Sequence, residues 1–473
     1  MNGQRRTYIK FAIVGAAILA ATGLTVAPTF VKPEGLTGVD PAAPQRCLGI
    51  FLVCMTLWFT NLIPLAATGL LAIALLPLLG VLPESQAFEL FGNSAVFFML
   101  GVFLLAAAMI STGLSKRVTL IALQRFDRSP TRLVVGVALS SSFLALWMPE
   151  HAVAAMMYPI VVEVTKTLNL KKGSNYAKKL FLALAWGSII GGVGTFLGGA
   201  RAPLALSLLR EASPETRISF LAWMAAAMPI VVVMTALAVW TLCSRIPSDI
   251  DDIKPATRML DERVKRLGPM SARERRLAGL GVLTVAAWIL LGNFLDLAVI
   301  AMVSAVLLFA LRVVDWNAVQ GYVNWGVLVM YGGAVALGRA ITETQAMDWV
   351  VGHVIHPAMP GLMVLMIMAA VAIFLTEGIS NSAAVAILLP IGYSLGDVTG
   401  INPAMITLAV TIPAGLAFLL PVGSPPSAIS FAAGHYSVRE MVRLGWPLNF
   451  AGLVLLLIVM VLWWGPVLNV NNW

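Results

Sequence analysis

The chain has 473 residues, of which 59% are hydrophobic and only 11% are charged. Soluble domains carry roughly 25% charged residues, so this composition excludes a water-soluble globule and predicts an integral membrane protein. The net charge of +9 comes from Lys and Arg in short connections between apolar runs, which is typical of cytoplasmic loops facing anionic lipids and gives no reason to expect nucleic acid as a partner. We expect a multi-pass protein of the plasma membrane, the inner membrane of a bacterium, with the lipid bilayer as its surroundings.

The amino-terminal region, residues 1–46, contains one apolar run at 11–27 followed by a connection rich in proline and glycine. We interpret the run as a retained first transmembrane helix with a cytoplasmic amino terminus, rather than as a cleaved signal peptide, although Arg5, Arg6 and Lys10 precede it. Helical spans need about 20 apolar residues. Further spans are predicted at 47–64, 65–81 and 95–110, and an interfacial helix is predicted up to residue 128.

An apolar run at residues 133–164 is interrupted by the polar sequence WMPEHAV at 147–153. Each remaining piece is too short to span a bilayer, which is typical of a re-entrant hairpin. A glycine-rich interruption divides the next span, at 187–206, and another span is predicted at 220–243. The long polar stretch at 244–276 is predicted to be a cytoplasmic linker.

The pattern repeats after the linker. A shift of 231 residues aligns Asn93 with Asn324 and Pro159 with Pro390. The second hairpin is expected near 351–395, where FLTEGISNSAAVAILLPI places polar residues inside an apolar run; such a break is tolerated only where protein or water surrounds it. Inverted repeats at 47–243 and 277–473 predict an all-α polytopic transporter with two re-entrant hairpins and about 11 transmembrane helices. Its other second-half spans are predicted at 277–291, 297–313, 326–341, 404–433 and 448–464.

Five segments resemble a known family. They are WFTNLIPLAATGLLAIALLPLLGVLP, FGNSAVFFMLGVFLLAAAMISTGLSKR, WGVLVMYGGAVALGRAI, FLTEGISNSAAVAILLPI and PAGLAFLLPVGSPPSAISF. Through them the chain resembles the divalent anion:sodium symporter family of the ion transporter superfamily. The resemblance implies transport of di- and tricarboxylates or sulfate, with two sodium ions and one anion held between Ser-Asn-Thr hairpin tips and Thr-Pro-Pro-like turns. It also implies a homodimer that forms through an outer scaffold domain.

The second half keeps the family pattern closely. A sodium ion prefers oxygen ligands, as hard cations do, and the expected sodium ligands are Thr376, Ser380, Asn381 and the carbonyl region of Gly423. Glu377 is interpreted as a partner for neighbouring backbone rather than as a transport residue. The alternative for the whole motif is a packing seam of small residues. The expected substrate-binding residues are Ser380, Asn381, Ser382, Ser424 and Pro425, together with His151 and Arg201 from the first half.

The first half departs from the pattern, because Pro149, Glu150 and His151 occupy the tip and Arg201 replaces a proline of the turn. Charged side chains at membrane depth cost roughly 2.5–3.5 kcal/mol each on insertion scales. Opposite charges about 4 Å apart attract by roughly 4 kcal/mol at an effective dielectric near 20. One hypothesis is that Arg201 supplies a fixed positive charge in place of one sodium ion, with Glu150 as its partner. The alternatives are that Glu150 carries a proton or cation, or that the two residues form a purely structural pair.

The expected function is secondary active transport of small divalent anions, C4-dicarboxylates or sulfate, by elevator-type alternating access. Coupling is expected by sodium symport with a reduced sodium requirement or by anion exchange, with sodium or a proton as the coupling ion and no cofactor beyond one sodium ion. An enzyme is not expected, because the Glu150–His151 pair lacks the HExxH spacing of a zinc protease. The alternatives are an efflux-type transporter of organic anions or arsenite, and a receptor that has lost transport.

Overall fold

The computed structural model describes residues 3–29, 31, 40–126, 128–292, 294–354 and 359–468; the predicted connection at 32–39 lies outside them. The described residues form helices and turns, and no strand occurs among them. Seven of the described helices are long and apolar enough to cross a membrane, and five shorter apolar helices accompany them. The all-α, multi-pass architecture is confirmed.

The first half contains the first hairpin and the first broken helix close to their predicted positions. Helices α7 and α8 make the hairpin, and the chain between α9 and α10 is the glycine-rich break. The helices are α1 (Gly3–Val26), α2 (Ala43–Thr60), α3 (Leu65–Leu78), α4 (Glu84–Glu89), η1 (Leu90–Gly92), α5 (Ser94–Ser111), α6 (Leu114–Arg125), α7 (Pro130–Ala145), α8 (Glu150–Thr167), α9 (Asn175–Gly191), α10 (Arg201–Ala212) and α11 (Phe220–Arg245).

The second half repeats this order after the linker helix α12 (Lys254–Leu267). Helices α18 and α19 make the second hairpin, and the chain from α20 to α21 is the second break. The helices are α13 (Ala272–Leu291), α14 (Leu297–Ala310), α15 (Trp316–Val319), η2 (Gln320–Tyr322), α16 (Trp325–Thr344), α17 (Ala346–Val354), α18 (Gly361–Thr376), α19 (Asn381–Thr399), α20 (Pro403–Thr411), η3 (Pro413–Gly415), α21 (Pro425–Phe431), α22 (Val438–Val459), η4 (Met460–Trp464) and α23 (Gly465–Leu468).

Several predicted boundaries differ from the structure; the broken span predicted at 187–206, for example, begins at Asn175 and ends at Ala212. The second hairpin begins at α18, after Pro360, and not near residue 351, which belongs to α17. Helices α13 and α22 begin several residues before the predicted spans, because capping boxes at Ser271 and Ser437 satisfy the first backbone N–H groups. The apolar runs therefore predicted helix starts that lie too late, because the first turns of these helices are polar.

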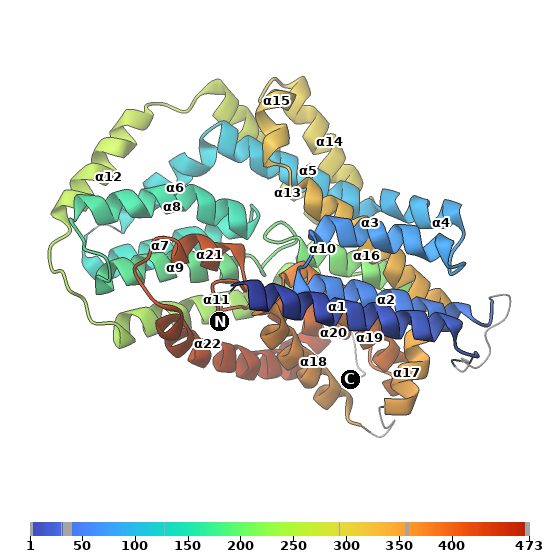
Figure 1. Ribbon diagram of the computed structural model, residues 1–473. Coiled ribbons are helices and arrows are strands. Elements are labelled where there is room, and N and C mark those ends of the chain that lie inside the picture. Colours follow the sequence, from blue (N-terminus) through green and yellow to red (C-terminus); the bar gives the residue numbers. More distant parts are fainter. Residues whose placement is uncertain are drawn as a thin grey trace.

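Each hairpin packs against one half of the first broken helix and one half of the second. The hairpin α7–α8 contacts α9 and α21, whereas α18–α19 contacts α10 and α20. Figure 1 shows the first group on the left and the second on the right, so that the hairpin tips approach each other in the middle of the molecule. The crossed arrangement is what two inverted copies of one unit produce.

Six other helices, here called the framework helices, make contacts that cross the repeats: α2, α3, α5, α13, α14 and α16. Helix α3 packs on α16, and α5 packs on α14. A β-carbon at Gly333 would lie 2.3 Å from the carbonyl oxygen of Gly69, so only glycine permits this approach. Close contact through small residues is a usual way for membrane helices to associate.

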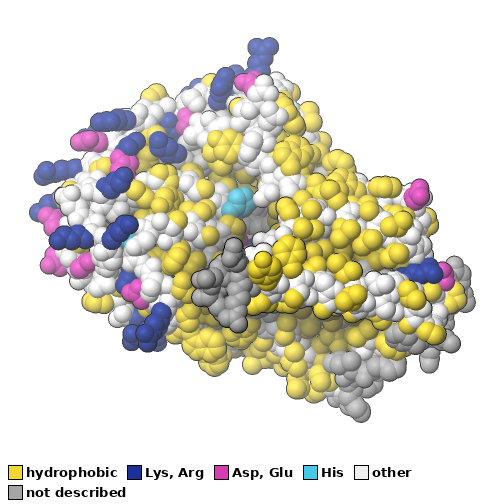
Figure 2. Space-filling view, viewed as in Figure 1, with side chains coloured by type: hydrophobic (Ala, Val, Ile, Leu, Met, Phe, Trp, Pro, Cys, Tyr) yellow, Lys and Arg dark blue, Asp and Glu magenta, His cyan; other side chains and the backbone are white. Residues whose placement is uncertain are grey.

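Basic side chains gather at one end of the molecule. Figure 2 shows Lys and Arg on the left, the region of α6, α8 and α12 in Figure 1, whereas the opposite side is largely hydrophobic. An excess of Lys and Arg marks cytoplasmic loops. This distribution agrees with a cytoplasmic linker at α12, which stays a prediction.

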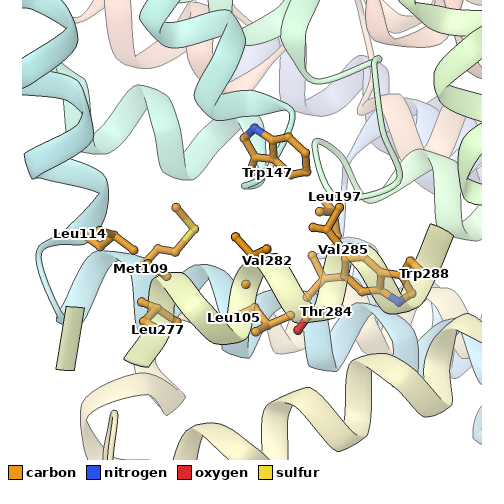
Figure 3. A pocket seen from close by; sticks show the side chains of 13 residues that line it. Leu105, Met109, Leu114, Trp147, Leu197, Leu277, Val282, Thr284, Val285 and Trp288 are labelled. Atoms are coloured by element: carbon orange, nitrogen blue, oxygen red, sulfur yellow. The ribbon is translucent and has the colours of Figure 1, made fainter. Parts of the chain in front are cut away.

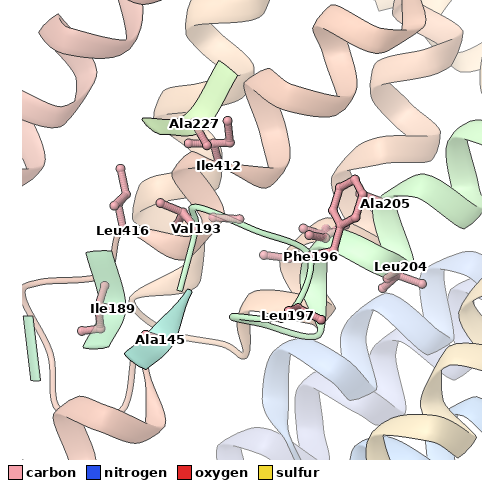
Figure 4. Packing of buried hydrophobic residues seen from close by; sticks show 14 of the residues in the cluster. Ala145, Ile189, Val193, Phe196, Leu197, Leu204, Ala205, Ala227, Ile412 and Leu416 are labelled. Carbon is pink, nitrogen blue, oxygen red and sulfur yellow. The ribbon is translucent and has the colours of Figure 1, made fainter. Parts of the chain in front are cut away.

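Apolar packing fixes the first break in place. The ring of Phe196 lies 5.1 Å from that of Trp223 and 5.6 Å from that of Phe220. The indole Nε1 of Trp223 donates a hydrogen bond to the carbonyl of Val193 at 3.1 Å. Figure 4 shows this break passing beside Ile412 and Leu416 of the second half. The two breaks therefore share one core at the centre of the protein.

Candidate functional site

The first residues of three helices meet at the centre: Glu150 of α8, Arg201 of α10 and Asn381 of α19. Arg201 Nη1 donates to Glu150 Oε2 at 3.1 Å, and Asn381 Nδ2 donates to Glu150 Oε1 at 3.2 Å. Glu150 is 5% exposed and Arg201 is 2% exposed. Since Glu150 and Asn381 lie 231 residues apart, equivalent positions of the two repeats are in direct contact.

The helix ends favour one of these charges and oppose the other. A helix amino terminus carries a partial positive charge, which favours Glu150 and opposes Arg201. The carboxylate of Glu150 offsets both the Arg201 charge and the ends of α8 and α10. The backbone N–H of Glu150 also donates to the carbonyl of Gly198 at 2.8 Å, which ties the hairpin to the break.

Two glycines hold the Arg201 side chain. A β-carbon at Gly199 would lie 2.5 Å from Arg201 Nη1, and one at Gly415 would lie 2.4 Å from Arg201 Nε. These glycines belong to the first and second breaks, so the guanidinium lies between the two repeats. Larger residues at either position would displace it from Glu150.

Three oxygen atoms come together beside this pair. The hydroxyl of Thr376 contacts Asn381 Oδ1 as a donor, and it lies 2.9 Å from the carbonyl oxygen of Ala414. A hydroxyl has one proton and can donate to one of these oxygens at a time. The donor set is neutral and oxygen-only, which suits a hard monovalent cation. Of the expected sodium ligands, Thr376 and Asn381 are brought together here, with Ala414 supplying the carbonyl.

The other expected residues of the second half surround this cluster in different roles. Ser380 caps α19, its hydroxyl accepting from the N–H of Ala383 at 3.2 Å. Ser424 caps α21, which begins at Pro425, and it donates to Ser427 at 3.1 Å. Ser382 faces the tyrosine of α16 described below, and Gly423 contacts Glu377.

Glu377 is held by the backbone of the second break. Its carboxylate accepts from the N–H groups of Phe418, Leu419 and Leu420 at 2.8–2.9 Å and from Asn449 Nδ2 at 3.0 Å. The interpretation of Glu377 as a backbone partner is confirmed. Its charge needs no cation, because hydrogen bonds to an ionised carboxylate are strong.

His151 lies apart from the ion pair. It lines a cavity of about 580 Å³ between α8, α5 and η2, together with Phe103, Tyr322 and Asn324. The imidazole meets the ring of Phe103 edge-on at 6.5 Å. His151 therefore lines this cavity while the Glu150 carboxylate bonds to Arg201 and Asn381. The expected role of His151 in substrate binding stays a prediction.

A second cavity, of about 340 Å³, lies on the other side of the first tip. Figure 3 shows Trp147 and Leu197 facing Val282, Val285 and Trp288 of α13. Its lining is almost entirely apolar. Because no charged side chain lines it, it is not a candidate for the anion site.

Two site residues were not expected from the sequence. Tyr331 of α16 is fully buried and faces Ser382, and Gly415 contacts the guanidinium of Arg201. The signal for Tyr331 is its polar hydroxyl inside the apolar segment GVLVMYGGAVALG. Gly415 has no such signal, because the contact joins residues of different repeats.

Comparison with known proteins identifies the family. Residues 16–470 match the model of the sodium:sulfate symporter transmembrane region. The chain belongs to this family. The sodium-dependent dicarboxylate transporter SdcS of Staphylococcus saprophyticus is 30% identical over 457 residues, covering 89% of this chain and 88% of SdcS. SdcS of Staphylococcus aureus is 28% identical over 464 residues, covering 91% of this chain and 87% of that protein. The predicted resemblance is confirmed, and a symporter-family protein is a transporter rather than an enzyme.

Solved structures of membrane transporters share the fold of this family member. MtrF of Neisseria gonorrhoeae, described as one of a class of antimetabolite efflux pumps, superposes with a TM-score of 0.57 at 13% identity, covering 97% of this chain and 94% of MtrF. The YdaH transporter of Alcanivorax borkumensis gives a TM-score of 0.51 at 16% identity, covering 88% of this chain and 98% of YdaH. At these identities the likeness concerns the fold alone.

Proposed function

We propose that this protein carries a small divalent anion, a C4-dicarboxylate or sulfate, across the membrane by secondary active transport. The family match and the name of SdcS as a sodium-dependent dicarboxylate transporter support the substrate class. The dicarboxylate is the first choice, since SdcS is described as a dicarboxylate transporter. Elevator-type movement and a homodimer formed through the framework helices are part of the proposal.

The observation that carries the proposal is the contact of Glu150 with both Arg201 and Asn381. Arg201 brings a permanent positive charge to the first half, and the oxygens of Thr376, Asn381 and Ala414 form a cation site in the second. One sodium ion then couples transport where the family resemblance implies two. Two alternative coupling modes are anion exchange and the movement of a proton carried by Glu150.

An elevator requires that the hairpins and broken helices move against the framework. Their packing as one crossed unit supports this step. Arg339 of α16 donates to Glu211 of α10 at 3.3 Å, and Asn93 Nδ2 donates to the same carboxylate at 3.2 Å. These contacts between the two parts would break and reform during each cycle.

The test is uptake of labelled succinate and labelled sulfate by purified protein in liposomes. With an inward sodium gradient, we expect uptake with a Hill coefficient for sodium of about one. Replacing sodium with potassium separates the coupling modes: complete loss of uptake excludes a sodium-free mechanism, and uptake that needs internal unlabelled succinate indicates exchange. Succinate that binds without being moved indicates a receptor, and outward-only movement indicates an efflux transporter.

A substitution links the sodium response to the second half. Thr376→Val keeps the shape of the side chain but removes the hydroxyl, and we expect the sodium concentration for half-maximal uptake to rise about tenfold. Thr60→Val is the matched control, because that buried hydroxyl bonds only to carbonyls of its own helix α2. An unchanged sodium response in Thr376→Val would contradict the assigned cation site.

A further inference from the structure

The proposed transport cycle gives no role to the apolar cavity beside the first hairpin. This cavity has a volume of about 340 Å³ and lies between the hairpin tip and the framework helices α5 and α13. Figure 3 shows Trp147 and Leu197 on one side of it and Val282 and Val285 on the other. An empty space loses dispersion contacts along its walls, and the cost of a cavity grows with its volume. We therefore expect it to hold a molecule.

The polar groups of the lining are already bonded to protein. The hydroxyl of Thr284 lies 2.7 Å from the carbonyl oxygen of Leu280 and 2.8 Å from Ser304 Oγ. Trp288 Nε1 donates to the carbonyl of Leu297 at 3.1 Å. A buried water needs about two to four polar partners, and apolar cavities stay dry. The molecule that fills this cavity is therefore apolar.

One wall of the cavity is continuous with an exposed apolar surface of α13. Val282 lines the cavity and is 70% exposed, and the neighbouring Leu283 is 68% exposed. In a membrane protein, large apolar side chains on the outer surface of a helix face lipid chains. A lipid chain can therefore enter the cavity from the bilayer without crossing water.

The length of the cavity matches one leaflet of a bilayer. Its lining on α13 runs from Leu277 to Trp288, a distance of about 16 Å at a rise of about 1.5 Å per residue. Half of the hydrocarbon core of a bilayer is roughly 15 Å thick. The rings of Phe98 and Phe220 pack on Trp288 at 5.7 Å and 5.5 Å and close that end. One extended acyl chain fits this shape.

The other end of the cavity lies beside basic side chains. Figure 3 places Leu277 at this end, and Arg273 lies one helical turn before it in the first turn of α13. Lys116 lies in the first turn of α6. The hydrogen bond from Arg117 to Glu274 at 2.7 Å holds these two helix starts together. Because Lys116 and Arg273 are both exposed, they can attract an anionic headgroup at the bilayer surface.

We propose that an anionic phospholipid binds here, with one acyl chain in the cavity and its phosphate beside Lys116 and Arg273. The chain fills the space between Trp147, which belongs to the part that the proposed elevator moves, and the framework helix α13. It stabilises this conformation by packing, and it shifts or leaves when Trp147 moves along α13. The lipid site goes beyond the proposed function, and lipid binding does not depend on transport.

Gly281 provides the test of the acyl chain, because it lines the cavity and a β-carbon there would meet no atom within 4 Å. Gly281→Phe therefore places a ring where the chain would lie. In native mass spectrometry of purified protein, we expect this variant to retain one phospholipid fewer than wild type. Added phosphatidylglycerol should raise the melting temperature of wild type, and half of this effect should need an at least about tenfold higher concentration in Gly281→Phe.

Gly279→Phe is the matched control. A β-carbon at Gly279 also meets no atom within 4 Å on the same helix, but Gly279 does not line the cavity. Both changes raise the helix propensity of α13 equally, so a difference between them reports on the cavity. A cavity filled by detergent or covered by a second copy of the chain would leave lipid retention equal in wild type and both variants. That result would overturn the proposal.

The double variant Lys116→Gln with Arg273→Gln tests the headgroup. Each basic residue near the surface favours an anionic lipid by a similar amount, so binding of phosphatidylglycerol should weaken about tenfold while binding of phosphatidylcholine stays unchanged. Equal binding of phosphatidylglycerol by the double variant and wild type would contradict the proposed headgroup position. A wild type that binds this lipid but moves neither succinate nor sulfate would contradict the proposed function and support the lipid site.

Discussion

The two hairpin tips occupy equivalent positions but use different chemistry. At the first tip, Glu150 and Arg201 are opposite charges in direct contact. At the second tip, Thr376 and Asn381 present neutral oxygens. The nearby carboxylate of Glu377 accepts hydrogen bonds from backbone N–H groups. The comparison teaches that two equivalent positions of one chain can hold an ion pair in one half and neutral oxygen atoms in the other.

The largest expected effect comes from breaking the ion pair at the first tip. Arg201→Met leaves Glu150 buried without its cation, and removal of one partner from a buried pair typically costs about 3–5 kcal/mol of unfolding free energy. The double variant Glu150→Gln with Arg201→Met should lose less than the sum of the two single variants. Denaturation in mild detergent measures all three.

The exposed pair of Arg263 and Glu163 is the control for this set of single and double variants. Its atoms lie 2.6 Å apart, but the side chains are 41% and 35% exposed. Arg263→Met should cost at most about 1 kcal/mol. Additive losses at Glu150 and Arg201 would show that the two charges do not stabilise each other.

A smaller effect is expected from Glu377→Gln at the second break. The amide keeps one acceptor and turns its NH₂ group toward backbone donors, so about 2–3 kcal/mol of unfolding free energy should be lost. The sodium dependence of uptake should not change, since Glu377 contacts backbone and Asn449 rather than the oxygens of Thr376 and Asn381. A shifted sodium response would assign Glu377 to the cation site.

The smallest expected effect concerns the ion pair of Arg117 and Glu274. Arg117 belongs to α6, which packs against α7 of the first hairpin. Arg117 of α6 donates to Glu274 at 2.7 Å and to the carbonyl of Gly268 at 2.8 Å. The hydrogen bond from Arg117 lowers the pKa of Glu274 to about 2 from its usual 4.5. The pair therefore stabilises the folded protein above pH 4.5, and this contribution is lost as the pH falls toward 2.

The measurement is the melting temperature of wild type and Glu274→Gln across this range. The difference between them should correspond to roughly 1 kcal/mol at neutral pH, the size of one net hydrogen bond, and shrink on acidification as Glu274 takes up a proton. A difference that is independent of pH would show that the Glu274 charge does not contribute.

Much of the fold follows from the sequence because membrane burial leaves a strong local pattern. The apolar runs, the polar interruption at Glu150–His151 and the shift that aligns Asn93 with Asn324 all lie in the chain itself. The boundaries at Ser271 and Ser437 were missed because the apolar pattern begins only after the polar first turns. The prediction of a linker at 244–276 likewise did not include a helix, whereas α12 lies within it and packs against α6 and α8.

By itself, the sequence determined that the protein crosses the membrane many times and that the two tips carry different residues, because hydropathy and composition are local properties. The inverted relation of the two halves stays a prediction. Only the tertiary structure decided that Glu150 contacts both Arg201 and Asn381, that Ala414 completes the oxygen cluster, and that Tyr331 faces Ser382. These contacts join helices from different repeats, and their partners are fixed by packing between segments far apart along the chain.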